Sequence, residues 1–225
     1  MGKPSTVAID GPAASGKSTL GYHLAQTLEY LFLDTGVLYR AVTWGVLDRG
    51  IPTEDEERVT SIARTMEIEV KPPDKSDGRQ CTVMTEGKDI TWQLRSPEVD
   101  QAVSPVSAYA GVRDALTQRM RDIAASGNVI MVGRDIGTVV LPDADLKLYV
   151  VASASERARR RHKQLTAKGK AVSYHEVLVS IKRRDRIDSS RQTAPLKPAA
   201  DAMIFDTTDL TIEAMFEKAE ALVNC

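Results

Sequence analysis

Short apolar runs alternate along the chain with longer segments of helical periodicity. Five runs have the length and composition of buried strands: "TVAI" before Asp10, "YLFLD" ending at Asp34, "NVIMVG" at 128–133, "LKLYVVA" at 146–152 and "AMIFDTT" at 202–208. Between the runs, apolar residues recur every three or four positions; Leu20, Leu24 and Leu28, for example, share one helix face. This alternation predicts an α/β fold in which helices cover both faces of a parallel sheet.

One region interrupts that alternation. From about Glu67 to Asp89 the sequence shows short alternating stretches around Pro72, Pro73, Gly78 and Gly87, which predict a small antiparallel meander. The α/β pattern resumes afterwards. We therefore interpret residues 1–225 as one domain that carries an insert at about 67–104.

The composition is that of a soluble globular protein, since 42% of the 225 residues are hydrophobic and 27% are charged. No segment approaches the roughly 18 apolar residues that a membrane span needs, and the first residues lack an apolar signal core. We therefore expect a cytoplasmic protein with no membrane partner. Cys81 and Cys225 fit no metal spacing and the three histidines are scattered, so we expect reduced thiols and no zinc site.

Charge is distributed unevenly along the chain. The formal net charge is −1, yet residues 156–191 hold 12 Lys and Arg against 4 Asp and Glu. A basic block of this kind indicates a polyanionic partner, either nucleic acid or the phosphates of a small ligand.

Residues 11–18, "GPAASGKS", match the phosphate-loop pattern G-x-x-x-x-G-K-[ST] between a predicted strand and a predicted helix. Gly11 and Gly16 allow backbone conformations that a Cβ obstructs, so successive N–H groups can point at one anion. Lys17 is expected to reach the outer phosphates, and the Ser18 hydroxyl to bind Mg²⁺. A nucleoside triphosphate is expected on this loop, contacted by Gly11, Pro12, Ala13, Ala14, Ser15, Gly16, Lys17, Ser18 and Thr19.

Two features suggest a second anion near the loop. Arg40 falls in the first turns of the helix predicted after Gly36, where a cation is unfavourable unless an anion lies nearby. Arg134 and Asp135 directly follow the strand at 128–133, at the edge of the sheet where open α/β folds bind ligands. The alternatives are a solvated Arg40 and a structural Arg134–Asp135 ion pair.

The basic block contains a third charged group. Ser173 and Glu176 form a capping-box pattern, and the apolar stripe that follows, Val177 and Ile181, continues at helical spacing as Arg184, Asp188 and Arg191. A helix that becomes charged on its buried face indicates a polar ligand cleft, the alternative being a last turn that frays into solvent.

The arginines bear on where the γ-phosphate goes. Phosphoryl transfer needs positioning and charge neutralisation more than a covalent group, so this many cations favour a phosphorylated acceptor over water. The segment at about 155–191 is then expected to be a lid that excludes water, although the sequence does not indicate which of Arg157, Arg159, Arg160 and Arg161 contacts the triphosphate.

The stretches "IDGPAASGKST", "LDTGVLYRA", "GRDIGTVVLPDADLKLYV", "RRDRIDSSRQTAPLKPAADA" and "DTTDLTIE" together resemble bacterial cytidylate kinases over nearly the whole chain. The resemblance implies the three-layer P-loop fold with a five-stranded parallel sheet, a small antiparallel monophosphate-binding insert and a helical lid. It also implies transfer of the γ-phosphate of ATP to CMP or dCMP with Mg²⁺, in pyrimidine nucleotide metabolism.

Carried over position by position, the resemblance implies that Arg40, Arg134 and Arg191 contact the acceptor phosphate, and Arg184 and Asp188 the sugar hydroxyls. It assigns the cytosine edge to Ser104, Arg113 and Asp135. Thr35 stands where the family often has serine, and its hydroxyl can make the same bond. The catalytic set is then Lys17, Arg134, Arg184 and Arg191.

Two other functions stay open at this point. One is a P-loop kinase for another monophosphate, and the other a nucleic-acid-binding P-loop protein that uses the basic block on a polyanionic backbone. Only Tyr174 interrupts that block as an aromatic residue, which argues against stacking on single strands. We expect a monomer whose partners are small nucleotides, without nucleic acid.

Overall fold

The computed structural model describes residues 3–167 and 169–223, and the chain divides into two compact units. The first unit combines residues 1–34 with residues 124–225, and the second unit is the continuous stretch 35–123. Within the described residues, every helix is too short or too polar to span a bilayer. The prediction of one domain with an insert at 67–104 and a lid at 155–191 stays a prediction.

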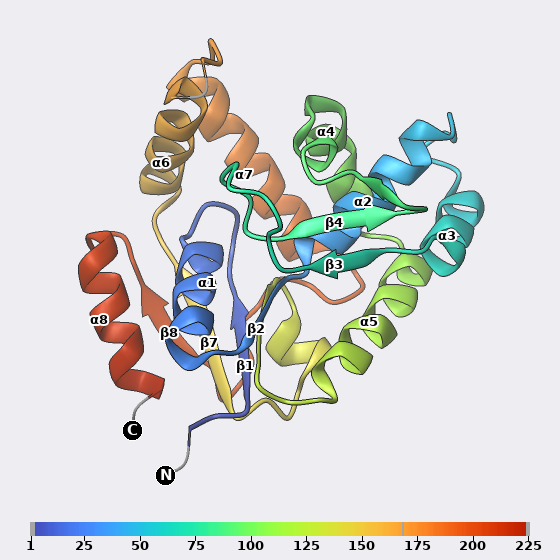
Figure 1. Cartoon of the computed structure of the whole chain (residues 1–225). Coiled ribbons are helices and arrows are strands. Elements are labelled where there is room, and N and C mark those ends of the chain that lie inside the picture. Colours follow the sequence, from blue (N-terminus) through green and yellow to red (C-terminus); the bar gives the residue numbers. More distant parts are fainter. Residues whose placement is uncertain (1–2, 168, 224–225) are drawn as a thin grey trace. The chain divides into compact units, whose positions relative to one another are not determined.

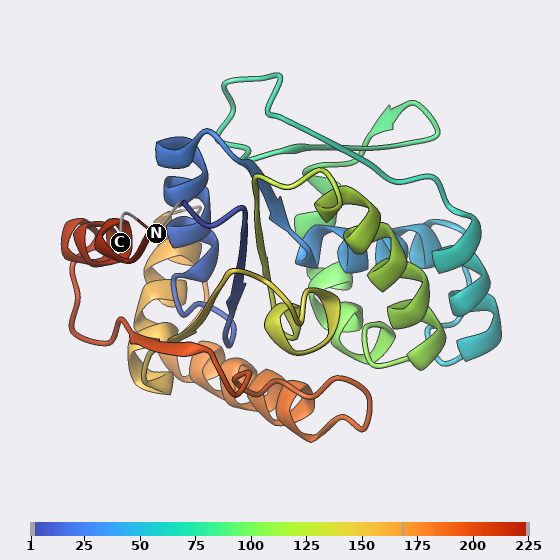
Figure 2. The ribbon, with the colours of Figure 1, turned by 90° about the horizontal axis from the view of Figure 1, so that it is seen from below.

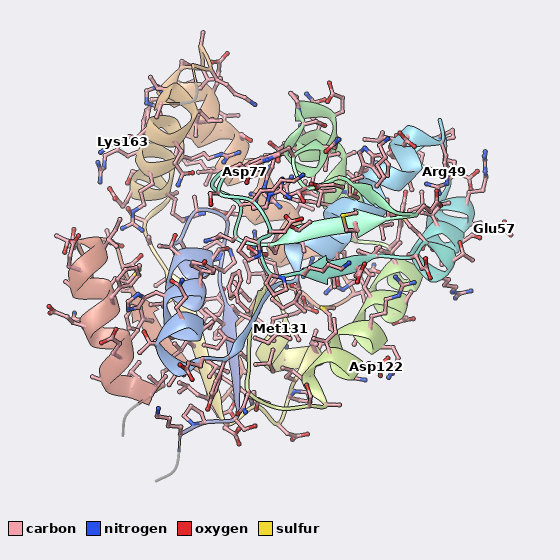
Figure 3. The ribbon with its side chains drawn as sticks, viewed as in Figure 1. Arg49, Glu57, Asp77, Asp122, Met131 and Lys163 are labelled. Carbon is pink, nitrogen blue, oxygen red and sulfur yellow. The ribbon has the colours of Figure 1, made fainter. Side chains whose placement is uncertain are left out.

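A five-stranded parallel sheet forms the centre of the first unit, which confirms the predicted fold class (Figure 1). Its strands follow the order β2 (Leu31–Asp34), β6 (Val129–Gly133), β1 (Thr6–Asp10), β7 (Leu146–Val151) and β8 (Met203–Asp206). Each strand coincides with one of the five apolar runs, because strands covered on both faces need nearly continuous apolar sequence. Met131, labelled in Figure 3, is fully buried in β6.

The helices of the first unit are α1 (Lys17–Leu28), α6 (Ala154–Ala167), α7 (Tyr174–Ser190) and α8 (Ile212–Val223). The predicted inner face of α1 is confirmed, because Leu20, Leu24 and Leu28 are buried in a core shared with the sheet. Helices α1 and α8 lie side by side, as Figure 2 shows. A π-helical turn, η2 (Ile136–Val140), follows β6.

Register places the ends of three strands together. Asp10 at the end of β1 pairs with Gly133 at the end of β6, and Asp34 at the end of β2 pairs with Val132. Since all three strands are parallel, the loop after β1 and the turn after β6 leave from the same edge of the sheet.

The second unit holds α2 (Gly36–Asp48), α3 (Glu56–Thr65), β3 (Glu69–Lys71), β4 (Thr82–Thr85), β5 (Lys88–Asp89), η1 (Gln93–Arg95), α4 (Pro97–Val106) and α5 (Ala110–Ala124). Strands β3, β4 and β5 form an antiparallel sheet, as the meander pattern predicts. Helices α3 and α4 were not predicted from the sequence. Their caps were readable, because the side chains of Asp55 and Ser96 each accept a hydrogen bond from the first turn of the helix.

A buried arginine organises the small sheet of the second unit. The Arg79 side chain is only 2% exposed and pairs with Asp74, Asp77 and Asp89. Asp77, labelled in Figure 3 on the loop before β4, also accepts a hydrogen bond from Trp92 Nε1 at 2.9 Å. Hydrogen bonds from Arg79 and Trp92 hold the pKa of Asp77 below its usual range, and bonds from Thr91 and Arg79 do the same for Asp89.

We expect acid to loosen this cluster. Because the pKa values of Asp77 and Asp89 are lower in the folded state, their stabilisation is present above about pH 4 and is lost as the pH falls below it. Arg79→Met should abolish that dependence and loosen the hydrogen bond from Trp92 Nε1 to Asp77 at neutral pH, which changes the surroundings of an indole that is already 43% exposed. Tryptophan fluorescence from pH 7 to pH 2 measures both effects, since Trp44 and Trp92 both belong to the second unit. A variant with the acid transition of the wild type would contradict this reading.

Candidate functional site

The loop after β1 has the backbone that a phosphate loop needs. Gly16 has φ 95°, in the region that favours glycine, and immediately precedes α1. A Cβ on Gly11 would lie 2.1 Å from the backbone oxygen of Val150 on β7, so only glycine fits there. The predicted strand–loop–helix context is therefore confirmed, with the loop at the N-terminus of α1.

Protein donors hold the carbonyl oxygens of this loop. Lys17 Nζ donates to the Pro12 oxygen at 3.0 Å, Arg157 to the Ala13 oxygen at 3.2 Å, and Thr207 Oγ1 to the Ser15 oxygen at 2.9 Å. The C=O and N–H groups of a trans peptide point in opposite directions. The backbone N–H groups of the residues after Ala13 and Ser15 therefore point away from Arg157 and Thr207. On that opposite side of the loop they can donate to an anion.

A carboxylate lies next to the predicted metal ligand. Ser18 Oγ donates to Asp34 Oδ2 at 2.6 Å, so the end of β2 meets the first turn of α1. Hydroxyl and carboxylate oxygens are the donors that Mg²⁺ prefers, and the pair therefore fits this ion. Asp34 was not predicted as a site residue, although a carboxylate at the end of a buried strand is a usable signal.

The charged residues predicted for the first unit come together. Arg134 Nε donates to Asp188 Oδ2 at 2.8 Å, which joins the turn after β6 to α7. Arg191, the C-cap of α7, lies 3.6 Å from Asp135, and both side chains are only 5% exposed. Helix α7 keeps its hydrogen bonds to the end and Asp188 is buried, so the alternative of a frayed last turn is wrong.

Electrostatics in this cluster favour an incoming anion. Burial lowers the pKa of Lys17 well below its usual value, and the neighbouring charges of Arg134 and Arg184 lower it further. Burial would raise the pKa of Asp188, but Arg134 and Arg184 hold it below its usual value. Several cations thus share a desolvated region, and a bound phosphate would relieve their mutual repulsion.

In the second unit, the predicted residue Arg40 is bound to the protein. Its guanidinium donates to Asp100 Oδ1 on α4 at 2.7 Å and to the Leu94 oxygen at 2.8 Å, and its side chain is 12% exposed. The alternative of a solvated Arg40 is therefore wrong. Thr35, the N-cap of α2, is 2% exposed.

The remaining two predicted residues of the second unit are connected through Ser107. Ser104 is buried on α4, and its backbone oxygen accepts a hydrogen bond from Ser107 Oγ at 3.0 Å. Arg113 donates to the Ser107 oxygen at 3.0 Å and lies over the ring of Tyr39, 5.3 Å from its centroid. Arg40, Ser104 and Arg113 are thus all built around α4 and the residue that follows it.

The basic block, residues 156–191, forms an antiparallel pair of helices, α6 and α7 (Figure 1). Arg157 makes a bidentate pair with Asp185 on α7, at 2.9 and 2.7 Å, in addition to its bond with the phosphate loop. Arg159 and Arg160 both bind Glu156, and Arg160 also bonds to Thr207. The segment therefore contacts the loop through Arg157, a role that the sequence could not assign.

Comparisons with known proteins agree on one family. The family model for cytidylate kinase matches residues 7–224. The chain is 47% identical over 224 residues to the cytidylate kinase of Herpetosiphon aurantiacus, covering 100% of this chain and 96% of the relative. It is 47% identical to the cytidylate kinase of Caldanaerobacter subterraneus, covering 94% and 91%, and 41% identical to that of Bacillus licheniformis, covering 100% and 98%.

Solved structures share the fold at low sequence identity. A gluconokinase from Sinorhizobium meliloti has a TM-score of 0.50 at 14% identity, covering 100% of this chain and 96% of the other. An uncharacterized protein from Eubacterium ventriosum has a TM-score of 0.53 at 11% identity, covering 99% of each chain. At such identities the likeness concerns the fold alone.

Proposed function

This chain belongs to the cytidylate kinase family and is a CMP kinase, and we propose that it moves the γ-phosphate of Mg²⁺-bound ATP to CMP or dCMP. The products are ADP and CDP or dCDP. One observation carries the proposal: a charged cluster lies beside the phosphate loop, in which Lys17 and Asp188 are buried and Arg134, Arg184 and Arg191 are partly buried.

On the donor side, we propose that the loop from Gly11 to Thr19 binds the phosphates of ATP. Its backbone amides supply fixed positive charge, and Lys17, whose Nζ donates to the Pro12 oxygen in this structure, would add its ammonium charge at the outer phosphates. Ser18 would hold Mg²⁺, with Asp34 beside it as a second oxygen donor. When bound, the ion neutralises charge on the outer phosphates.

On the acceptor side, we propose that Arg134 and Arg191 orient the CMP phosphate so that one of its oxygens faces the γ-phosphorus. That oxygen forms the new P–O bond while the bond to the β–γ bridging oxygen breaks, and ADP leaves with the electron pair. Arg184 and Asp188 hold the ribose, and Asp135 accepts from the exocyclic amine of cytosine. Thr35, Arg40, Ser104 and Arg113 are proposed as further residues that contact the acceptor.

The acceptor specificity gives the first test. Uracil carries a carbonyl where cytosine carries its amine, so UMP would leave Asp135 facing another acceptor. In a coupled assay, kcat/KM for CMP and dCMP should exceed that for UMP and AMP by about 10²-fold or more. Absence of turnover with both cytidine nucleotides would refute the proposal, and equal use of UMP would refute the role of Asp135.

We also propose that the protein works as a cytoplasmic monomer on small nucleotides, without nucleic acid or a membrane. The absence of nucleic acid is supported by the ion pairs of the basic block, since Arg157, Arg159 and Arg160 bind carboxylates of their own helix pair. A salt-dependent shift with an oligonucleotide that persists at saturating ATP and CMP would instead favour the nucleic-acid alternative.

A further inference from the structure

Asp10, the last residue of β1, is a buried carboxylate that the proposed reaction does not use. It is 4% exposed. Its Oδ1 accepts the backbone N–H of Ile136 at 2.8 Å, and its Oδ2 accepts the backbone N–H of Gly137 at 2.8 Å. Both oxygens therefore serve one peptide segment, the start of η2.

Those two bonds, together with the sheet, fix the backbone on both sides of Arg134 and Asp135. Gly133 is fixed in the sheet as the β6 partner of Asp10, and Ile136 and Gly137 are fixed by the carboxylate of the same residue. Only Arg134 and Asp135 lie between the two anchor points. The placement of the Arg134 and Asp135 side chains therefore depends on Asp10, although the two hydrogen bonds of Asp10 go to Ile136 and Gly137.

Ionisation of the Asp10 carboxyl group is unfavourable at this position. Burial raises the pKa of Asp10 to about 6 in spite of the two amide donors, and the nearby Asp135 charge adds to the effect while Arg134 opposes it. Tyr149 on β7 is the sheet partner of Asp10, and burial raises the pKa of that phenol, with the Asp10 charge adding to the effect. The pKa is higher in the folded state, so ionised Asp10 weakens folding as the pH rises through about 6. Stability alone does not explain an aspartate here.

We propose that Asp10 is a positioning residue of the acceptor site, whose carboxylate sets the placement of Arg134 and Asp135 through the amides of Ile136 and Gly137. The inference rests on the proposed roles of Arg134 and Asp135 in binding the acceptor. Asp10 itself contacts no substrate in this scheme.

Asp10→Asn tests the proposal, because the amide keeps the size of the side chain but turns an NH₂ group toward one of the two backbone donors. With CMP varied at saturating ATP, kcat/KM should fall at least about tenfold, whereas KM for ATP should change less than about threefold. Asp145→Asn is the matched control. Asp145 accepts from the backbone N–H and the hydroxyl of Thr6 at the opposite end of β1, so a general weakening of that strand would affect both variants.

The pH profile separates positioning from mere structure. Protonation of Asp10 removes an acceptor in the wild type, and the CMP phosphate also takes up a proton near pH 6. The decline of kcat/KM for CMP as the pH falls through about 6 should therefore be steeper in the wild type than in Asp10→Asn, where only the substrate titrates in this range. Gly137→Ala is a second variant that retains Asp10. Its Cβ would lie 3.5 Å from Asp10 Oδ2 and 3.1 Å from Lys147 Cδ, and the same loss selective for CMP is expected.

Arg134→Ala, measured in parallel, distinguishes the two possible failures. If it leaves the CMP kinetics intact, the acceptor role of Arg134 is wrong and the proposal for Asp10 falls with it. If it impairs CMP use while Asp10→Asn and Gly137→Ala do not, only the proposal for Asp10 is overturned. Equal losses toward ATP and CMP in the Asp10 variant would likewise overturn it.

Discussion

Lys17→Ala is expected to lower kcat with CMP by about 10²- to 10³-fold, because it removes a buried positive charge from the point where the transferred group develops negative charge. The melting temperature of the ligand-free protein should not fall. The pKa of Lys17 lies well below its usual value, so its charge is unfavourable in the fold until an anion binds. A coupled assay and thermal melting without nucleotide measure the two effects.

Lys218→Ala provides the matched control for that variant. Lys218 is an exposed lysine of α8, outside the proposed site, and its removal should leave kcat and the melting temperature unchanged. A Lys17 variant that retains more than a tenth of the wild-type kcat would show that the ammonium group is not part of the reaction.

Asp188→Ala is expected to reduce kcat/KM for CMP by about 10²-fold while KM for ATP changes less than about threefold. Asp188 is 4% exposed and is the partner of Arg134 Nε, and its charge offsets those of Arg184 and Arg191. Without the carboxylate the guanidinium groups repel one another and lose their placement. Stability should fall by about 3 kcal/mol, since one partner of a buried ion pair is removed.

Two comparisons make the Asp188 result interpretable. Glu217→Ala, on the exposed side of α8, removes one negative charge outside the site and should not change the kinetics. Steady-state kinetics at a temperature well below the melting transition of each variant keep the loss of stability apart from the loss of function. Unchanged use of CMP by the Asp188 variant would contradict the proposed ribose contact.

Most of the first unit could be predicted from sequence because its signals are local. Five apolar runs became five strands, and the leucines of α1 became its buried face. Asp55 and Ser96 show where that approach fell short: each caps a helix that was not predicted. Helix α3 precedes the insert, and α4 begins inside the insert, which was interpreted only through its strand-like stretches. Cys225, expected to be a reduced thiol, lies outside the described residues.

The site was predictable as a set of charges but not as a set of contacts. Arg134, Asp135, Arg184, Asp188 and Arg191 stood out because charge at a strand end or on a buried helix face requires an explanation. Their pairing did not follow from sequence, since residues 54 positions apart, such as Arg134 and Asp188, meet only through the sheet and α7.

Residues whose role depends on register were out of reach for the same reason. Asp10 appeared only as the residue before the phosphate loop, and nothing in its neighbourhood along the chain indicates Ile136 and Gly137 as its partners. Those contacts depend on which strand lies beside β1, and the sequence pattern predicts strands without their order.

The split of the first unit into two pieces of chain has a consequence for how the protein folds during synthesis. Strand β1 emerges from the ribosome early, but both of its neighbours, β6 and β7, lie beyond residue 128. Residues 35–123 are synthesised before β6 and β7. The residues of this continuous stretch form a compact unit with one another. We therefore expect the second unit to fold first. The phosphate loop is expected to become ordered only after β6 and β7 have been synthesised and have paired with β1.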